Sequence, residues 1–135
     1  MSQRHKVIHP AHFPPARGYA NGVVTSGRTL HIAGQIGWER DGTFADTAFR
    51  AQFARALDNV IDVVHAAGGF PTDVVKMTIY VTDMDAYRNA AAELGPIWRE
   101  RFGKHYPAMA LVGVTDLVHP DAMIEIEATA SLLQE

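Results

Sequence analysis

The sequence predicts an α+β fold, a two-layer sandwich in which two helices cover one face of a mixed or antiparallel sheet. Three observations support this prediction. The chain has 135 residues, of which 47% are hydrophobic, so we expect one folded domain over residues 1–135. Several short segments alternate apolar and polar residues, as strands do. Two longer segments repeat apolar residues every three to four positions, as helices do.

The N-terminal part is expected to be an extended arm followed by two strands. Residues 1–18 hold three of the seven prolines, which favours an arm that lies over the domain. Residues 22–26 and 28–36 are β-rich, and Ser26-Gly27 between them predicts a tight turn joining antiparallel strands. Alternation divides the second strand into two faces: Leu30, Ile32, Gly34 and Ile36 on one, and His31, Ala33 and Gln35 on the other.

The first helix is predicted to begin at about Asp46, a candidate N-cap. Gly68-Gly69, followed by Pro71, would end it after about five turns. The helical stripe consists of apolar residues at helical spacing: Phe49, Phe53, Leu57, Val60, Ile61 and Val64. A strand over residues 74–83 follows this helix.

The second helix is predicted to begin after Asp83 or Asp85. Its stripe again has helical spacing: Tyr87, Ala91, Leu94, Trp98 and Phe102. Gly95-Pro96 falls inside this stripe, so we expect a kink or a break there. Residues 108–114 and 123–133 alternate as strands, which gives a ββαβ–αββ order.

Two helices can cover only one face of such a sheet, so the other face must meet water or a partner. We therefore expect a homo-oligomer. The alternative is a monomer whose uncovered sheet face is polar.

Composition and charge argue against several classes of protein. Twelve lysines and arginines against 15 acidic residues give a net charge of −3, which disfavours nucleic acid and anionic membranes as partners. The absence of cysteine removes thiolate nucleophiles, disulfides and cysteine-type zinc sites. No segment has the apolar length of a membrane helix, and the first 18 residues lack the apolar core of a signal peptide. We expect a cytoplasmic protein.

The sequence offers little support for metal or cofactor chemistry. His9 and His12 form a close pair, but no HExxH or HxH motif accompanies them, and an exposed pair on a proline-rich arm needs no metal. The chain also lacks a nucleophile elbow, a phosphate-binding loop and a dinucleotide fingerprint. We therefore expect neither a metal nor a cofactor.

Glu125 and Glu127 are the carboxylates of greatest interest. They lie two residues apart on the last predicted strand, so both point away from the face of Ile124 and Ile126. One interpretation is an ordinary solvated strand face. The other is that one carboxylate lines a cleft between subunits, where it positions water or accepts a proton.

Seven short segments together resemble the RidA/YjgF family of small trimeric proteins, several of which hydrolyse reactive enamines and imines. The matching segments are Gly18-Tyr19 with Asn21-Gly22, Gly34-Gln35-Ile36, Leu57-Asp58-Asn59-Val60, Ala66-Ala67-Gly68, Tyr80-Val81-Thr82-Asp83, Tyr106-Pro107-Ala108 and Ile124-Glu125-Ile126-Glu127-Ala128. The resemblance implies a chorismate-mutase-like fold of the bacillus type and a homotrimer that binds small molecules between subunits. It also implies that Tyr19 lines the cleft, that the Gly34 backbone approaches the ligand, and that Glu125 places the attacking water.

The sequence departs from the family pattern at three positions. Deaminase members have an arginine after Pro-Ala that clamps the substrate carboxylate, but here Met109 follows Pro107-Ala108. Ala33 stands where a serine is common, and Leu111 replaces a common cysteine, although its backbone carbonyl remains available. Arg17 on the arm, or His105, is a candidate replacement cation, but the simpler interpretation of each is an ordinary surface arginine and an ordinary loop histidine.

These observations give three hypotheses of function. The first is a cofactor-independent hydrolase of enamines or imines, in which Glu125 places water and the substrate packs against Tyr19, Met109 and Leu111. Its substrate is expected to be larger than 2-aminoacrylate, for example an aminomuconate-type acid. The second is a non-catalytic small-molecule-binding or regulatory trimer, which Met109 favours. The third and weakest is an endoribonuclease, an activity attached to early names in the family.

Overall fold

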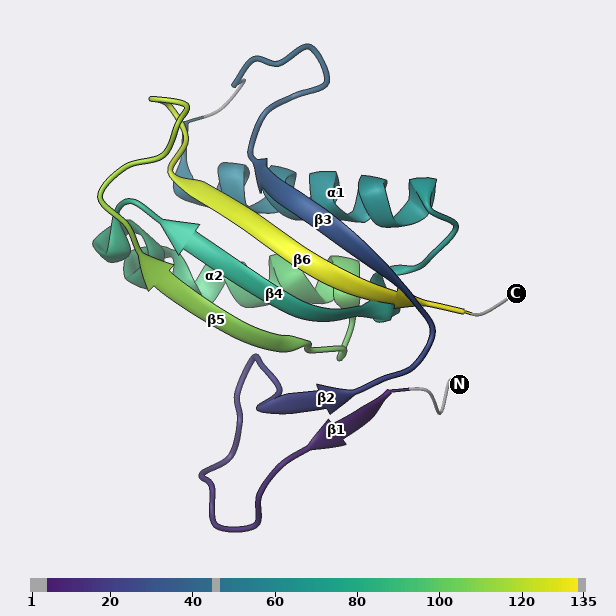
Figure 1. Ribbon diagram of the computed structural model, residues 1–135. Helices are drawn as coiled ribbons and strands as arrows, with labels where there is room; N and C mark the ends of the chain where they lie inside the picture. The colour runs from purple at the N-terminus through teal and green to yellow at the C-terminus, as the bar shows by residue number, and fades with distance from the viewer. Residues whose placement is uncertain (1–4, 45–46, 134–135) are drawn as a thin grey trace.

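The computed structural model describes residues 5–44 and 47–133. Its main sheet has four strands in the order β3-β6-β4-β5 (Figure 1). The strand bounds are Arg28–Ile36 for β3, Ile124–Leu132 for β6, Val74–Val81 for β4 and Ala108–Gly113 for β5. β6 runs antiparallel to β3 and β4, whereas β4 and β5 are parallel. The predicted α+β class with a mixed sheet is therefore confirmed.

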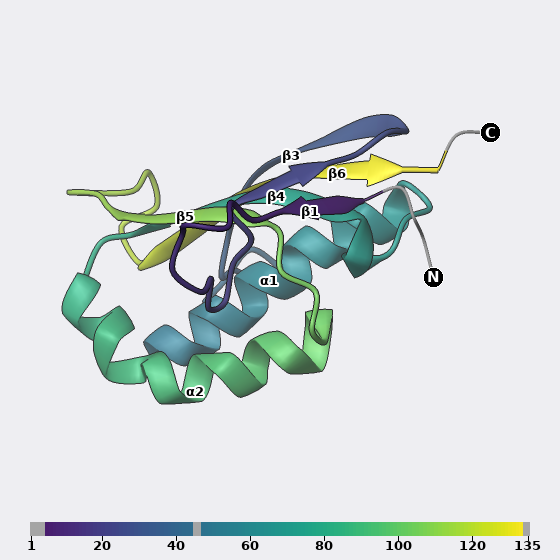
Figure 2. The same ribbon diagram turned by 90° about the horizontal axis from the view of Figure 1, so that it is seen from below.

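Both helices, α1 (Phe49–Ala66) and α2 (Met84–Phe102), lie on the same face of this sheet (Figure 2). A short 3₁₀ turn, η1 (Pro71–Asp73), connects α1 to β4. The core between the layers is built from the predicted stripes and the inward positions of the strands, with Leu57, Val60, Val64, Met77, Ile124 and Ile126 fully buried. Neither helix combines the length and apolar character that a membrane-spanning helix needs.

The predicted strand pair joined at Ser26-Gly27 is wrong. β2 (Gly22–Val24) pairs instead with β1 (Lys6–Ile8), and the two form a separate antiparallel ribbon beside the main sheet (Figure 1). β3 pairs with the distant β6, because this pairing buries Ile32 among core residues, whereas the three residues of β2 are at most half-buried. Residues 1–18 thus contain a strand within the predicted arm.

The helix ends agree partly with prediction. Asp46, the candidate cap of α1, lies outside the described residues, and the N-cap of the helix is Ala48. Gly68 has a φ of 85°, and the Gly69 N–H donates to the Val64 carbonyl at 2.9 Å, so the glycine stop is confirmed. Asp83 caps α2, because its Oδ1 accepts a hydrogen bond from the Ala86 N–H at 3.0 Å.

Of the kink or break predicted at Gly95-Pro96, the break is wrong, because α2 continues through Pro96. Two physical reasons explain this. Gly95 has no Cβ to clash with the following proline ring. Leu94 and Trp98, on either side of the proline, are both buried against the core and hold the helix to the sheet.

A β-bulge interrupts the predicted alternation of β3. Ile32 pairs with Ala128 and Gln35 with Ile126, so three steps along β3 oppose two along β6. Ala33 and Gly34 at the bulge are both exposed, and Gly34 therefore does not continue the core face of Leu30 and Ile32.

The sheet face opposite the helices is uncovered in the chain, and it is polar. His31, Lys76, Tyr80 and Glu127 lie on it, each exposed or half-buried. The sequence predicted that two helices would cover only one face of the sheet. The other face is accordingly open to solvent or to a partner.

Candidate active site

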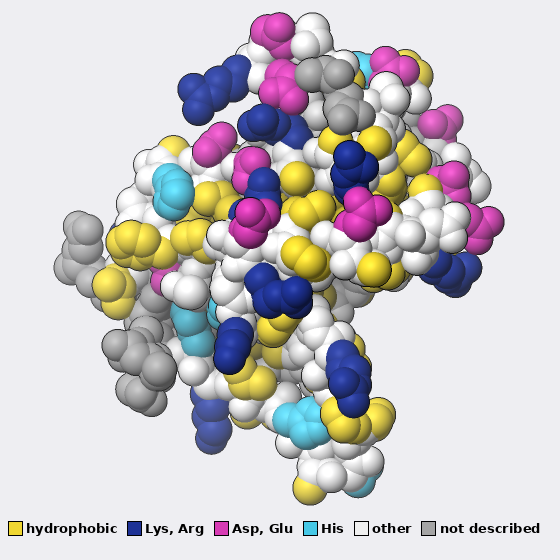
Figure 3. Space-filling model, turned by 180° about the vertical axis from the view of Figure 1, so that it is seen from behind, with side chains coloured by type: hydrophobic (Ala, Val, Ile, Leu, Met, Phe, Trp, Pro, Cys, Tyr) yellow, Lys and Arg dark blue, Asp and Glu magenta, His cyan; other side chains and the backbone are white. Residues whose placement is uncertain are grey.

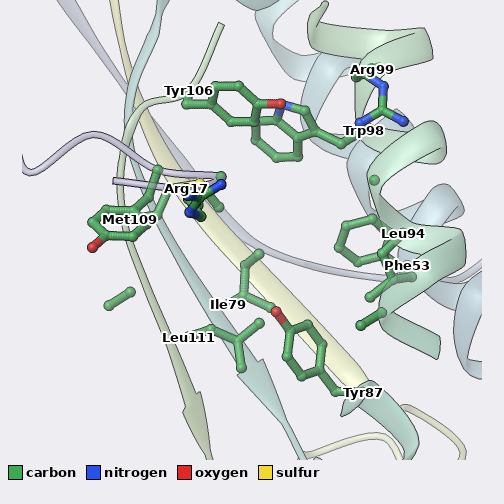
Figure 4. Close-up of a pocket in the computed structure, with 15 residues that line it drawn as sticks. Arg17, Phe53, Ile79, Tyr87, Leu94, Trp98, Arg99, Tyr106, Met109 and Leu111 are labelled. Carbon is green, nitrogen blue, oxygen red and sulfur yellow. The ribbon is translucent and has the colours of Figure 1, made fainter. Parts of the chain in front are cut away.

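A pocket of about 410 Å³ lies between β5, α2 and the segment before β2 (Figure 4), and we call it the β5–α2 pocket. Four residues singled out from the sequence line it: Arg17, Tyr19, Met109 and Leu111. Met109 and Leu111 pair in register with the core residues Met77 and Ile79, so their side chains share the helix-covered face of the sheet. The volume of the β5–α2 pocket falls within the range of roughly 300–1,000 Å³ that small-molecule sites occupy.

Backbone pairing positions Tyr19 at this pocket. The N–H of the next residue, Ala20, donates to the Pro107 carbonyl at 2.9 Å, and Ala20 forms a parallel bridge with Ala108. Ala20 is buried, whereas Tyr19 is exposed. The pairing therefore attaches the arm to the start of β5 and presents Tyr19 beside Met109.

The inner wall of the β5–α2 pocket is apolar and rigid. Phe53, Ile79 and Leu94 are buried at its base. The Trp98 ring lies nearly parallel to Tyr106, with 5.8 Å between centroids, and the Trp98 Nε1–H donates to the His105 carbonyl at 3.1 Å. The indole is thus fixed and has no free N–H for a ligand.

His105, the second candidate cation, does not line this pocket. Its Nε2 lies 2.6 Å from the Val74 carbonyl, to which it donates, and its ring is half-buried beside the start of β4. This arrangement gives His105 a structural role and leaves Arg17 as the predicted cation that the structure places at the pocket.

A second pocket, of about 340 Å³, lies at the β3 bulge, and we call it the bulge pocket. It contains two of the three remaining predicted site residues, Gly34 and Glu125, with an apolar rim that includes Trp38 and Val118. Ala33 is adjacent to Gly34 in the chain but lines neither pocket.

Glu125 lies directly over Gly34. A Cβ built on Gly34 would come within 2.7 Å of Glu125 Cδ and 2.9 Å of its Cγ, which no real Cβ tolerates. Glycine at position 34 is therefore what allows the carboxylate to lie on the backbone of the bulge. Within the described part of the chain, no hydrogen bond or ion pair engages the Glu125 carboxylate.

Glu127 has different surroundings, although it shares the strand and face of Glu125. Its Oε2 accepts a hydrogen bond from the Tyr80 hydroxyl at 2.7 Å. This hydrogen bond raises the pKa of the Tyr80 phenol above its ordinary value. Glu127 is thus engaged with a neighbouring side chain, whereas no hydrogen bond engages the Glu125 carboxylate among the described residues.

Two side-chain amides of α1, the half-buried Asn59 and the buried Gln52, hold the strand and loop around the bulge pocket. Asn59 on α1 donates from Nδ2 to the carbonyls of Ile36 at 2.9 Å and Trp38 at 3.2 Å. Gln52 donates to the Asp121 carbonyl at 3.0 Å and accepts from the Met123 N–H at 2.8 Å. Both amides belong to α1, so these contacts hold the end of β3 and the loop before β6 against that helix.

The two pockets cannot serve one small ligand within a single chain. Met109 and Leu111 lie on the helix-covered face of β5, whereas Glu125 lies on the uncovered face of β6. β4 separates these strands, which puts them about 10 Å apart along the sheet. The chain therefore carries two separated parts of the predicted site.

Sequence reasoning missed Arg99, Tyr87 and Tyr106, all of which line the β5–α2 pocket (Figure 4). Tyr87 belongs to the apolar stripe that the sequence assigned to the core, and Arg99 lies beside that stripe as a polar residue that the stripe does not include. The sequence signal that could have revealed Arg99 is its position four residues after Gly95, because residues four apart lie on the same face of a helix.

No group of three or more histidine, cysteine or acidic side chains able to hold a metal occurs within residues 5–44 and 47–133.

Residues 10–132 match the protein family described as endoribonuclease L-PSP. The chain belongs to this family. The human 2-iminobutanoate/2-iminopropanoate deaminase is 32% identical over 93% of this chain and 88% of its own length. A RutC family protein of Pyrococcus horikoshii is also 32% identical, over 93% of this chain and 96% of that protein.

Solved structures of the L-PSP family agree with the fold. A protein of the conserved Rid family from Yersinia pestis, YyfB, has a TM-score of 0.86 and 36% identity, covering 96% of this chain and all of that one. RidA from a Psychrobacter species has a TM-score of 0.68 and 30% identity, covering 94% of this chain and 99% of that one. The two-layer arrangement described above is thus the chorismate-mutase-like fold that the resemblance implied.

Proposed function

We propose that this member of the L-PSP family is a cofactor-independent deaminase of imines or enamines. The observation that carries the proposal is the Glu125 carboxylate, which lies unpaired over the Gly34 backbone in a chain related to named imine deaminases. The human, bovine and mite relatives all bear the name 2-iminobutanoate/2-iminopropanoate deaminase.

The proposed reaction is addition of water to a C=N bond. Protonation of an enamine carbon gives an iminium ion, and Glu125 accepts a proton from water as the water oxygen bonds to the iminium carbon. Glu125 returns that proton to the nitrogen of the resulting carbinolamine, and as the C–N bond breaks the carboxylate takes the proton of the new hydroxyl group, so that ammonia and a neutral carbonyl product leave. Addition of water to an activated C=N bond requires only modest catalysis, so one positioned carboxylate that accepts a proton is enough.

The proposal includes a homotrimer in which the cleft forms between subunits. Its support is the separation of the β5–α2 pocket from the bulge pocket on opposite faces of the sheet, since a neighbouring copy supplies the missing part of each cleft. Arg17, Tyr19, Met109 and Leu111 of one subunit would then face Gly34 and Glu125 of the next. The cytoplasm as the place of this reaction stays a prediction from the sequence.

The substrate is proposed to be larger than 2-aminoacrylate. Met109 cannot form the forked hydrogen bonds by which an arginine holds a small carboxylate, and its thioether adds apolar surface instead. The apolar inner wall of the β5–α2 pocket accommodates a bulkier body.

The test is ammonia release from imines generated in situ by an amino-acid oxidase or a dehydratase. We expect Glu125→Gln to lower the rate at least about 100-fold, because the variant cannot accept a proton. Glu127→Gln is the matched control on the same strand and face, and it should stay within about twofold of wild type. Equal rates for wild type and Glu125→Gln would falsify the assignment of Glu125.

Met109 also favours a second candidate, a non-catalytic trimer that binds small molecules. Met109→Arg discriminates the two. If wild type is inactive and Met109→Arg gains hydrolysis of small imino acids, the chain is a binding protein on a deaminase scaffold. Ribonuclease activity, suggested by the family's description, is disfavoured by the net charge of −3, and any such activity that survives Glu125→Gln does not belong to this cleft.

A further inference from the structure

The β5–α2 pocket is lined by cations and hydrogen-bond donors, although the chain as a whole is acidic. Its lining includes two arginines, Arg17 and Arg99, and three tyrosines, and among the residues that the structure describes no aspartate or glutamate lines it. On the helix side of the molecule, most acidic side chains gather in the upper half, whereas the lower half shows mainly basic and histidine side chains (Figure 3). The local charge of this region therefore favours an anion.

Neither arginine of the pocket has a protein partner in the described part of the chain. Other arginines do: Arg50 pairs with Glu93, Arg55 with Glu39, and Arg101 with Asp58. Two unpaired guanidinium groups beside an apolar wall are suited to a ligand that brings its own negative charge.

We propose that the β5–α2 pocket binds organic monocarboxylates with an aromatic or other large apolar body, that Arg99 holds the carboxylate, and that Arg17 adds positive charge from the β5 side of the pocket. Phe53, Ile79 and Leu94 provide the apolar surface for the body. This inference deepens the proposed function, on which it rests, because it names the substrate class of the same cleft.

The position of Arg99 follows from the glycine one turn before it in α2. A Cβ on Gly95 would lie 3.2 Å from Arg99 Nη1 and 3.8 Å from Nη2, so the guanidinium lies directly along the bare backbone at Gly95. In Figure 4 Arg99 projects from α2, whereas Arg17 comes from the segment beside Met109. The two cations thus reach the pocket from different elements.

A carboxylate held from α2 instead of from position 109 on β5 is anchored at the helix side of the pocket. Its body must then extend across the apolar wall before it reaches the β5 edge. A two-carbon or three-carbon acid leaves that wall uncovered, whereas a phenyl group buries apolar surface there. The geometry therefore selects for ligand length.

The test measures binding of 3-phenylpropanoate by calorimetry. Binding of 3-phenylpropanamide tests whether the negative charge is needed, and binding of propanoate tests whether the phenyl group is needed. We expect the amide and the short acid each to bind at least about tenfold more weakly than 3-phenylpropanoate. Arg99→Gln should lower affinity for 3-phenylpropanoate about tenfold, Arg17→Gln should lower it less, and Arg99→Lys should restore part of the loss.

Arg88→Gln is the matched control, because Arg88 is an exposed arginine of α2 outside the pocket. Equal binding of acid and amide, absence of binding, or equal affinities of Arg99→Gln and Arg88→Gln would overturn the inference. Circular dichroism of each variant checks that the fold is retained.

A kinetic comparison separates this inference from the proposed function. For the imine formed from phenylalanine by an amino-acid oxidase, Arg99→Gln should raise KM about tenfold with kcat within about twofold. Binding without hydrolysis in wild type would overturn the proposed function alone. If wild type and Arg99→Gln hydrolyse the imine with the same KM, this inference alone would be overturned.

Discussion

Glu125 and Glu127 show how neighbouring residues of one type acquire different roles. The sequence correctly placed both on the face opposite Ile124 and Ile126. It could not distinguish them, because the difference arises from residues distant in the chain. Tyr80 on β4 engages Glu127, and the bulge of β3 brings Gly34 beneath Glu125.

Substitution of Gly34 tests the position of the Glu125 carboxylate. We expect Gly34→Ala to lower imine hydrolysis at least about tenfold, because the new methyl group displaces the carboxylate and small misplacements are costly in catalysis. Gly22→Ala is the control, since its Cβ would meet Ile8 at an ordinary 3.6 Å. Full activity of Gly34→Ala would show that the carboxylate position does not matter.

The hydrogen bond between Tyr80 and Glu127 predicts a pH dependence. It raises the pKa of the phenol above about 10, so its stabilising contribution is present below that pH and is lost as pH rises through the folded-state pKa. Titration of labelled tyrosine by NMR should give a lower pKa for Tyr80 in Glu127→Gln than in wild type. An unchanged pKa would assign the shift to another cause.

At the scale of elements, both helices and the four long strands could be predicted from periodicity, because each buries one face against the same core. The pairing of the first strands could not. β2 and β3 are adjacent in sequence and have a plausible turn between them, but the partner of β3 is decided by the apolar residues it buries with β6. The bulge was hidden for a similar reason, since apolar residues alternate through it without interruption.

Pro96 in the middle of α2 leads to a prediction of stability. A proline there leaves the Ala92 carbonyl without its helical donor, although packing keeps the helix continuous. Pro96→Ala should raise the free energy of unfolding by about 1–2 kcal/mol, after allowance for the greater flexibility of the unfolded chain. Urea denaturation measures this change. No gain would mean that the helix already compensates for the missing hydrogen bond.

At the scale of the whole molecule, the uncovered sheet face and the separation of the two pockets are both compatible with the proposed homotrimer. The sequence predicted that these site residues form one cleft, but within one chain the topology distributes them over opposite faces of the sheet. No reading of local pattern could reveal this, because it depends on which strands lie at the edges of the sheet.

Subunit complementation tests a shared cleft. Analytical ultracentrifugation should give a mass three times the 14.8 kDa of the chain. At substrate concentrations well below KM, where Arg99→Gln alone should keep about a tenth of the wild-type rate, Arg99→Gln and Glu125→Gln chains refolded together should recover about one quarter of that rate, because one cleft in four then combines two intact parts. Each variant refolded alone is the control. Failure to recover activity in a trimer of confirmed mass would place both parts in one subunit's own cleft.

The segment that carries Arg17 and Tyr19 is attached to the molecule at two points. The β1–β2 ribbon holds one, and the pairing of Ala20 with Pro107 and Ala108 holds the other. The ribbon lies apart from the four-stranded sheet (Figure 1). Proteolytic trimming through β1 would therefore release one attachment and weaken ligand capture without unfolding the domain, which makes the arm a natural place for specificity to diverge between otherwise identical scaffolds.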